Sequence, residues 1–156
     1  MTRLTKNRVL IYTDGACEDN PGGAGGWAFL IVGSEFDQEF QHSGGEESTT
    51  NNRMELQAIL EALNYFNSPR SIKIVSDSKY SINCCTEWIK VWKSKNWIKS
   101  DGSEVKNIDL LQSIDELINF HQVSFQWVKG HSGDKYNEIV DSLATNEIQF
   151  YRPLHK

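Results

Sequence analysis

Short apolar runs near the start of the chain predict three β-strands. Val9–Thr13 is rich in β-branched and aromatic residues and stops at Asp14-Gly15, which is a typical turn pair. A second run follows at Trp27–Val32, and a third strand is expected near Glu35–His42. Because Gly33-Ser34 suits a two-residue hairpin turn, these strands should be consecutive and antiparallel.

Helical spacing of apolar residues begins after Thr50. It predicts a helix that runs to the stop signal at Ser68-Pro69, and a fourth strand follows at Ile72–Val75. That strand comes after a helical crossover, so it can lie parallel to the first. The same spacing predicts helices from Ser78 through Ile89, over about 110–118 and over about 137–148, with a fifth strand at 123–128.

This order of elements predicts an α/β fold in which helices cover a mixed sheet. We expect one domain over residues 1–156, with a core of about 9–148 and loose termini that include Tyr151–Lys156. The longest apolar run has six residues, whereas a membrane-spanning helix needs roughly 20. We therefore expect no membrane partner.

Charge and cysteine content narrow the function further. Sixteen Lys and Arg residues against 21 Asp and Glu give a net charge of −5, which excludes a protein that coats nucleic acid through global positive charge. Met1–Arg8 is basic but is not followed by the apolar segment of a secretory signal. Three cysteines, of which Cys84 and Cys85 are adjacent, form no disulfide framework, so a cytoplasmic location is expected.

Four acidic residues are candidates for a shared site. Asp14 and Asp77 follow two strands predicted to be parallel, at the carboxyl ends where α/β sheets bind ligands. Each alone is more typical of a turn or a helix cap. Glu55 lies on the apolar stripe of its helix and so points toward the sheet. Asp141 lies near the apolar line of the last helix, although favourable first-turn charge explains it equally well.

Converging carboxylates repel one another unless a cation lies between them. Ligands that are all oxygen select a hard ion, Mg²⁺ or Mn²⁺, and the histidines lack the spacing of a zinc site. Two such ions about 4 Å apart would activate a water and stabilise a leaving oxygen. The pattern therefore indicates phosphodiester hydrolysis.

Several motifs, taken together, resemble a known family. They are Tyr12-Thr13-Asp14-Gly15, Asn20-Pro21-Gly22, Thr50–Leu56, Ser76-Asp77-Ser78, Val105-Lys106-Asn107 and Trp127–Gly133 with Asp141. In this order, over about residues 9–148, the chain resembles the type 1 class of ribonuclease H, the bacterial single-domain form. The resemblance implies a ribonuclease H-like fold whose five-stranded sheet has its first three strands antiparallel and its fourth and fifth parallel to the first.

The resemblance also implies an activity and a catalytic set. It implies an endonuclease that cuts the RNA strand of RNA·DNA hybrids by a two-metal-ion mechanism, leaving 5′-phosphate and 3′-hydroxyl ends. Asp14, Glu55, Asp77 and Asp141 match the carboxylates that bind two Mg²⁺ ions, with Mn²⁺ as a possible substitute. His131 matches a mobile histidine that assists proton transfer or product departure, and the glycines beside it permit that mobility.

Further matches concern the substrate. Asn20, Asn51 and Asn52 match positions that read the ribose 2′-hydroxyl in the minor groove, although capping or turn formation also explains them. Thr50 and Asn107 resemble a pocket for a phosphate of the DNA strand. Two departures from the family pattern are the acids Glu18-Asp19, in the glycine loop that leads into Gly22–Gly26, and Ser48 where some relatives carry Arg.

A basic segment with interleaved tryptophans compensates for the negative net charge. It comprises Trp88, Lys90, Trp92, Lys93 and Lys95, and no acid occurs from Ile89 to Ser100. This segment resembles the handle of bacterial members, in which Trp88 and Trp92 match positions that line the DNA-strand channel. A solvated helix face would explain the lysines, and core packing would explain one or two tryptophans. Neither explains why both residue types occur together in this segment. We expect strongly salt-dependent binding of the hybrid.

Two other functions remain open at this point. A DNA-directed nuclease with the same fold and metals would cut an all-DNA duplex. A non-catalytic nucleic-acid-binding module would bind without metal and cleave nothing, although clustered carboxylates would repel its ligand. We expect a monomer without an obligate protein partner.

Overall fold

The structure, a computed structural model, is built around one five-stranded sheet with the strand order β3-β2-β1-β4-β5. The strands are β1 (Val9–Cys17), β2 (Gly25–Val32), β3 (Phe40–Glu46), β4 (Ser71–Ser76) and β5 (Gln122–Trp127). β2 is antiparallel to β1 and β3, whereas β4 is parallel to β1 and β5 is parallel to β4. The predicted mixed sheet is confirmed.

The structure describes residues 8–33 and 38–153. The N-terminal segment considered as a secretory signal lies mostly outside this range. None of the helices in the described part of the chain is long and apolar enough to cross a membrane.

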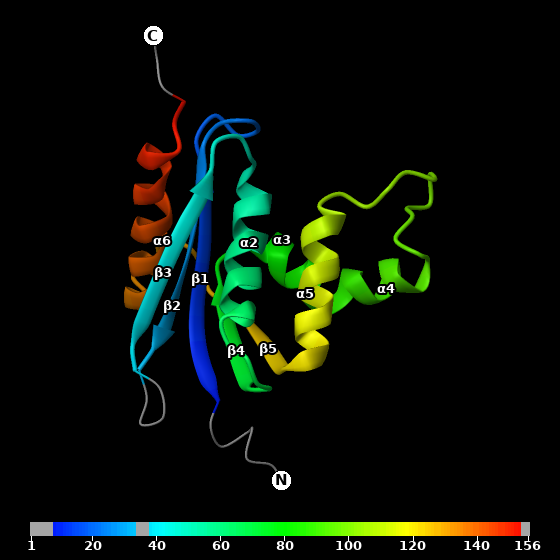
Figure 1. Cartoon of the computed structure of the whole chain (residues 1–156), viewed down its shortest axis with the longest axis horizontal. Coiled ribbons are helices and arrows are strands. Elements are labelled where there is room, and N and C mark those ends of the chain that lie inside the picture. The colour runs from blue at the N-terminus through cyan, green and yellow to red at the C-terminus, as the bar shows by residue number, and fades with distance from the viewer. Residues whose placement is uncertain (1–7, 34–37, 154–156) are drawn as a thin grey trace.

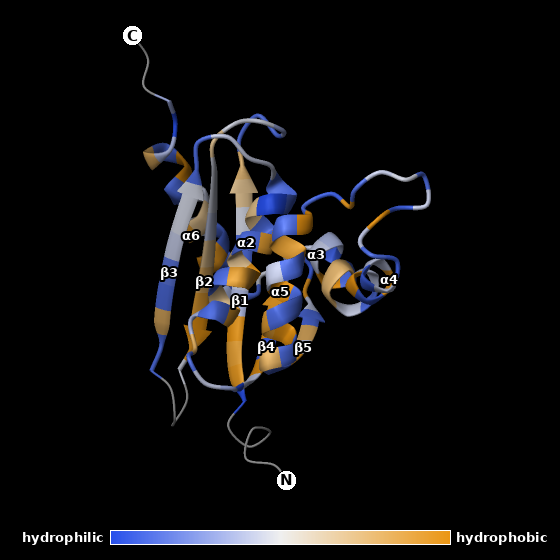
Figure 2. Cartoon of the chain, turned by 45° about the vertical axis from the view of Figure 1, so that its right-hand side comes forward, coloured by the Kyte–Doolittle hydropathy of each residue, from blue (hydrophilic) through white to orange (hydrophobic). Residues whose placement is uncertain are grey.

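Helices cover both faces of the sheet. α2 (Asn51–Asn64) and α5 (Ile108–Phe120) lie on one face, and α6 (Lys135–Glu147) lies on the other (Figure 1). Figure 2 shows that β1, β2 and β4 are hydrophobic where they pass beneath α2 and α5, while β3 is blue or near white over most of its length. Fully buried residues such as Ile11, Leu56 and Ile74 form this core. Burial of each such side chain contributes about 1.5–3 kcal/mol to the free energy of folding. This packing helps to hold the strand ends in register.

The helical segment after β4 is longer and less regular than predicted. It consists of α3 (Lys79–Asn83), a π-helical turn (Cys84–Trp88) and α4 (Ile89–Ser94). α4 and the loop after it project away from the sheet (Figure 1). A π-type turn has i→i+5 hydrogen bonds and interrupts α-helical spacing here for only five residues, too short a stretch for periodicity to reveal.

The third strand was predicted too early in the chain. β3 begins at Phe40, and its register places Ile31 opposite Phe40. A two-residue turn at Gly33-Ser34 is therefore wrong; residues 34–37 of the predicted turn and strand lie outside the described range. A Gly-Ser pair marks a chain reversal without defining its length.

The C-terminal segment is packed against the sheet. After a 3₁₀ turn (Ile148–Phe150), the ring of Tyr151 lies so close to Gly45 that a Cβ there would be 2.7 Å from it. Arg152 Nη2 forms an ion pair with Glu18 Oε1 at 3.0 Å. The expectation of a loose tail is therefore wrong for Tyr151 and Arg152, while 154–156 lie outside the described residues.

Candidate functional site

Three acidic side chains meet at one end of the sheet. Asp14 lies on β1, Glu55 on the first turns of α2, and Asp77 directly after β4; each offers a carboxylate oxygen, and these oxygens lie within 4.8 Å of one another. The parallel register pairs Tyr12 with Val75, so the acids two residues further along each strand emerge side by side. The predicted convergence of these three carboxylates is confirmed.

Two glycines permit this close approach. A Cβ on Gly15 would lie 2.4 Å from the backbone nitrogen of Glu55, so β1 and the start of α2 touch backbone to backbone. A Cβ on Gly130 would lie 3.0 Å from Asp77 Oδ2. The three carboxylates can therefore come together only because glycine, which has no Cβ, occupies positions 15 and 130.

Burial of carboxyl groups in this cluster disfavours their ionised form unless a positive charge lies beside them. Burial, with the nearby Asp77 charge, raises the pKa of Asp14 to about 8. Burial and the charges of Asp14 and Asp77 raise the pKa of Glu55 well above its usual value. Glu55 Oε1 is buried and has no hydrogen-bond partner among the described residues. An unpartnered carboxylate oxygen beside two further acids fits a hard divalent cation.

These shifts predict how the metal-free protein responds to pH. The pKa of Asp14 rises from 3.8 to about 8 on folding, so the folded state holds more protons between these values and stability falls as pH rises through them. Relative to the Asp14→Asn variant, the wild type should lose about 2–4 kcal/mol between pH 5 and about pH 8.5 in chelator. Urea unfolding measures this, and parallel pH profiles for the two proteins would contradict it.

α6 contributes an acid and an amide near the cluster. Asp141 is not one of the three acids within 4.8 Å, although its charge helps to raise the pKa of Asp14. Asn137 is buried, and its Nδ2 donates a hydrogen bond of 3.4 Å to Asp77 Oδ2. The sequence interpretation missed Asn137, although it lies four residues before Asp141 and so on the same helix face.

His131 lies in the exposed loop between β5 and α6. Its backbone has a φ of 56°, in the left-handed region, and Gly133 nearby has a φ of 92°. The same loop brings Gly130 against Asp77. His131 thus belongs to a loop that borders the acidic cluster and has its own side chain in solvent.

Five predicted substrate residues line one pocket of about 320 Å³. They are Asn20, Thr50, Asn51, Asn52 and Asn107, joined by Pro21 and Lys106. Asn20 Oδ1 accepts a hydrogen bond of 3.0 Å from the backbone nitrogen of Asn51, which links the glycine loop to the start of α2. Lys106 adds a positively charged side chain to the pocket lining. The sequence interpretation included Lys106 in a motif but assigned it no role.

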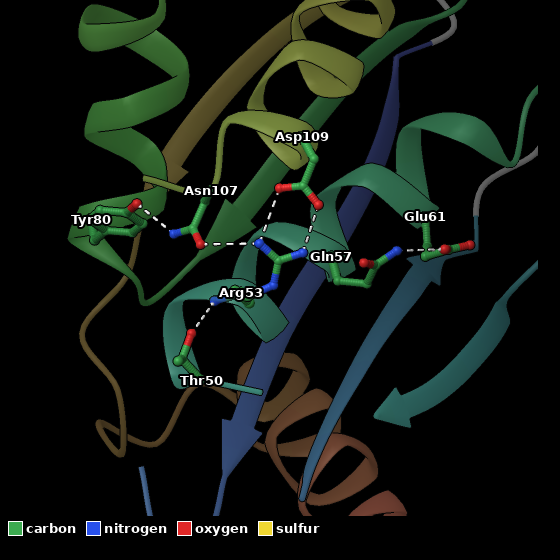
Figure 3. Close-up of polar contacts among 7 residues, drawn as sticks. All are labelled: Thr50, Arg53, Gln57, Glu61, Tyr80, Asn107 and Asp109. Carbon is green, nitrogen blue, oxygen red and sulfur yellow. Dashed lines mark hydrogen bonds and ion pairs between the residues drawn. The ribbon is translucent and has the colours of Figure 1, made fainter. Parts of the chain in front are cut away.

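A polar network fixes the amide of Asn107 within this pocket (Figure 3). Arg53 Nη1 donates to Asn107 Oδ1 at 3.2 Å, and Asn107 Nδ2 donates to the hydroxyl of Tyr80 at 3.0 Å. Arg53 also makes a bidentate contact with Asp109, at 3.1 and 2.8 Å. These contacts pre-form the pocket wall before any ligand is bound.

The projecting basic segment divides into two surfaces. The rings of Trp88 and Trp92 stack at 5.9 Å and, with Lys95, help to line a pocket of about 220 Å³. Lys90 is exposed on α4. Lys93 instead faces α5, where its Nζ lies 2.9 Å from Asp115 Oδ2. The sequence suggested one uniform set of lysines, but the structure pairs one of them with an acid.

Comparison with known proteins identifies close relatives. The family model described as RNase H matches residues 6–149. The ribonuclease H of Wolbachia pipientis wMel is 44% identical over 145 residues, 93% of this chain and 98% of that protein. The ribonuclease H of Ruthia magnifica is 48% identical over 139 residues, which are 88% of this chain and 93% of that protein. A crystal structure of a type 1 RNase H with the type 2 active-site motif has a TM-score of 0.82 at 28% identity, over 93% of this chain and 74% of that one.

Proposed function

Because the chain belongs to the ribonuclease H family and so acts on RNA·DNA hybrids, we propose that it is an endonuclease that hydrolyses their RNA strand at the acidic cluster, leaving 5′-phosphate and 3′-hydroxyl ends. The observation that carries this proposal is the convergence of Asp14, Glu55 and Asp77 oxygens within 4.8 Å. Charge of this density opposes a phosphate backbone unless cations intervene, so the cluster serves metal-dependent chemistry.

The three clustered acids would hold two Mg²⁺ ions, for which Mn²⁺ could substitute, and Asp141 would be the fourth carboxylate. Bound ions of this kind supply an activated water and stabilise the leaving oxygen. The unpartnered Glu55 Oε1 and the raised pKa of Asp14 support this assignment. Asn137 orients the Asp77 carboxylate through its hydrogen bond, and His131 moves a proton or assists product departure from its exposed loop.

Substrate recognition is assigned to the pocket beside α2. Asn20, Asn51 and Asn52 read the ribose 2′-hydroxyl of the RNA strand. Thr50 and Asn107 hold a phosphate of the DNA strand, and Lys106 adds the charge that this contact requires. Support comes from the shared pocket, which all of these residues line.

The handle binds the DNA strand through Trp88, Trp92, Lys90 and Lys95, with a smaller contribution from Lys93. Stacked rings beside a lysine provide both apolar surface and positive charge for a nucleic-acid backbone. The chain acts as a monomer without an obligate protein partner. The three cysteines are free thiols, which agrees with a reducing, cytoplasmic setting.

A substrate panel tests the activity. One labelled strand is placed in an RNA·DNA hybrid, an RNA duplex and a DNA duplex, each with Mg²⁺ or chelator. We expect cleavage of RNA in the hybrid with Mg²⁺ alone. Cleavage of the DNA duplex would favour a DNA-directed nuclease, and binding without any cleavage would favour a non-catalytic module.

The ion pair of Lys93 predicts unequal effects among the handle lysines. Lys90→Ala or Lys95→Ala should raise KM for the hybrid by about threefold to tenfold and reduce the salt slope by about 0.7–0.9 each. Lys93→Ala should have a smaller effect because Asp115 already neutralises part of its charge. Steady-state kinetics across a salt series measures this, and loss of kcat with unchanged KM would show that the segment lies elsewhere than on the substrate path.

A further inference from the structure

An ion pair joins the C-terminal segment to the glycine loop. Arg152 Nε donates to both carboxylate oxygens of Glu18, at 3.1 and 3.0 Å, and Nη2 lies 3.0 Å from Oε1. The segment itself is held by Tyr151 against Gly45. Figure 1 shows the described part of the C-terminal segment, drawn in red after α6, at the same end of the sheet as the loop between β1 and β2.

The glycine loop, which Arg152 contacts through Glu18, is bridged by backbone hydrogen bonds and is linked to the substrate pocket. The backbone nitrogen of Glu18 donates to Ala24 O at 3.0 Å, and that of Gly22 donates to Thr49 O at 2.7 Å. Between them, Asn20 accepts a hydrogen bond from Asn51 and lines the pocket. Glu18 and Asn20 therefore belong to one loop that backbone hydrogen bonds close and tie to the start of α2.

The ion pair also changes the charge of the loop. The hydrogen bond from Arg152 lowers the pKa of Glu18, and the guanidinium offsets the negative charge of this carboxylate. Its neighbour Asp19 is exposed and makes no side-chain hydrogen bond or ion pair within the described part of the chain. Two adjacent acids thus have different surroundings, and Asp19 provides a matched control.

We propose that Arg152 is a positioning residue for hybrid binding, which holds Glu18 and thereby keeps Asn20 at the wall of the pocket. This inference rests on the proposed function, because the pocket is taken to bind the hybrid. Exposed ion pairs contribute little to overall stability, so the effect should concern substrate affinity more than folding. Within the described part of the chain the side chain of Arg152 pairs with Glu18 and not with the three clustered acids, so its role is positioning and not catalytic.

A mutant cycle separates positioning from simple charge. Removing the negative charge of Glu18 should improve binding of a polyanion if charge alone matters. Positioning predicts the opposite: Glu18→Ala and Arg152→Ala should each raise KM by about threefold to tenfold with kcat unchanged, and the double variant should be no worse than either single one. Arg152→Lys should restore part of the affinity, and Asp19→Asn should leave KM unchanged or lower it.

A second measurement is independent of activity. Without substrate, amide hydrogen exchange at Gly22 and Gly23 should accelerate severalfold in Glu18→Ala and Arg152→Ala but not in Asp19→Asn. Unchanged exchange, additive KM effects, or a lower KM for Glu18→Ala would overturn the inference. If the wild type cut no hybrid, the proposed function would fail, while accelerated exchange would still support the loop contact.

Discussion

Replacing Asp14 with Asn is expected to abolish metal-dependent cleavage of hybrid RNA, with kcat reduced by about a thousandfold or more. The amide keeps the size of the side chain but removes a charge from the centre of the three-acid cluster. Cation affinity therefore falls, while the fold is retained because ionisation of the buried Asp14 carboxyl group opposes folding. Single-turnover kinetics and Mg²⁺ titration measure the two effects.

A suitable control is Asp19→Asn, which removes one acid close to the site but outside the cluster and should retain activity. Circular dichroism establishes that both variants are folded. Substantial turnover by Asp14→Asn in a folded protein would contradict the metal-binding role of this carboxylate.

Gly15→Ala is expected to destabilise the protein by about 3 kcal/mol and to weaken cation binding. Its Cβ would lie 2.4 Å from both the Glu55 nitrogen and the Met54 carbonyl carbon, and neither backbone atom can turn aside as a side chain can. β1 must therefore separate from α2, which moves Asp14 away from Glu55. Urea unfolding and calorimetric Mg²⁺ titration measure the two consequences.

The Gly102→Ala variant is the control for Gly15→Ala, because it introduces backbone strain without a steric clash of the new Cβ. Gly102 has a φ of 88° and open space around its position, so alanine there should cost only about 1 kcal/mol and leave Mg²⁺ binding unchanged. Equal losses of stability in the two variants would show that the close approach at Gly15 is not a tight one.

The order and type of the elements were predictable because apolar spacing reports directly which face of a strand or helix is buried. Asp14 and Asp77 were predictable for a related reason: both end parallel strands, and neighbouring parallel strands bring their ends together. Glu55 followed from its place on an apolar helix stripe. Each of these inferences needed only local pattern and the handedness of the chain connections.

The contacts that were missed are ion pairs between different segments of the chain. Arg152 and Glu18 are 134 residues apart, and nothing in local periodicity pairs them. Lys93 on α4 meets Asp115 on α5 through a tertiary contact, which the spacing of apolar residues does not encode. The start of β3 was missed because a turn signal does not report loop length.

The parallel pairing of β1 with β4 has a consequence during protein synthesis. Asp14 emerges early from the ribosome, but it has no partner acid on β4 until Asp77 has been made and the crossover through α2 has closed. Long-range parallel pairing of this kind forms slowly compared with helices. A nascent chain that has not yet reached Asp77 therefore lacks the three-acid cluster, and the ability to cut nucleic acid arises only after β4 has paired with β1.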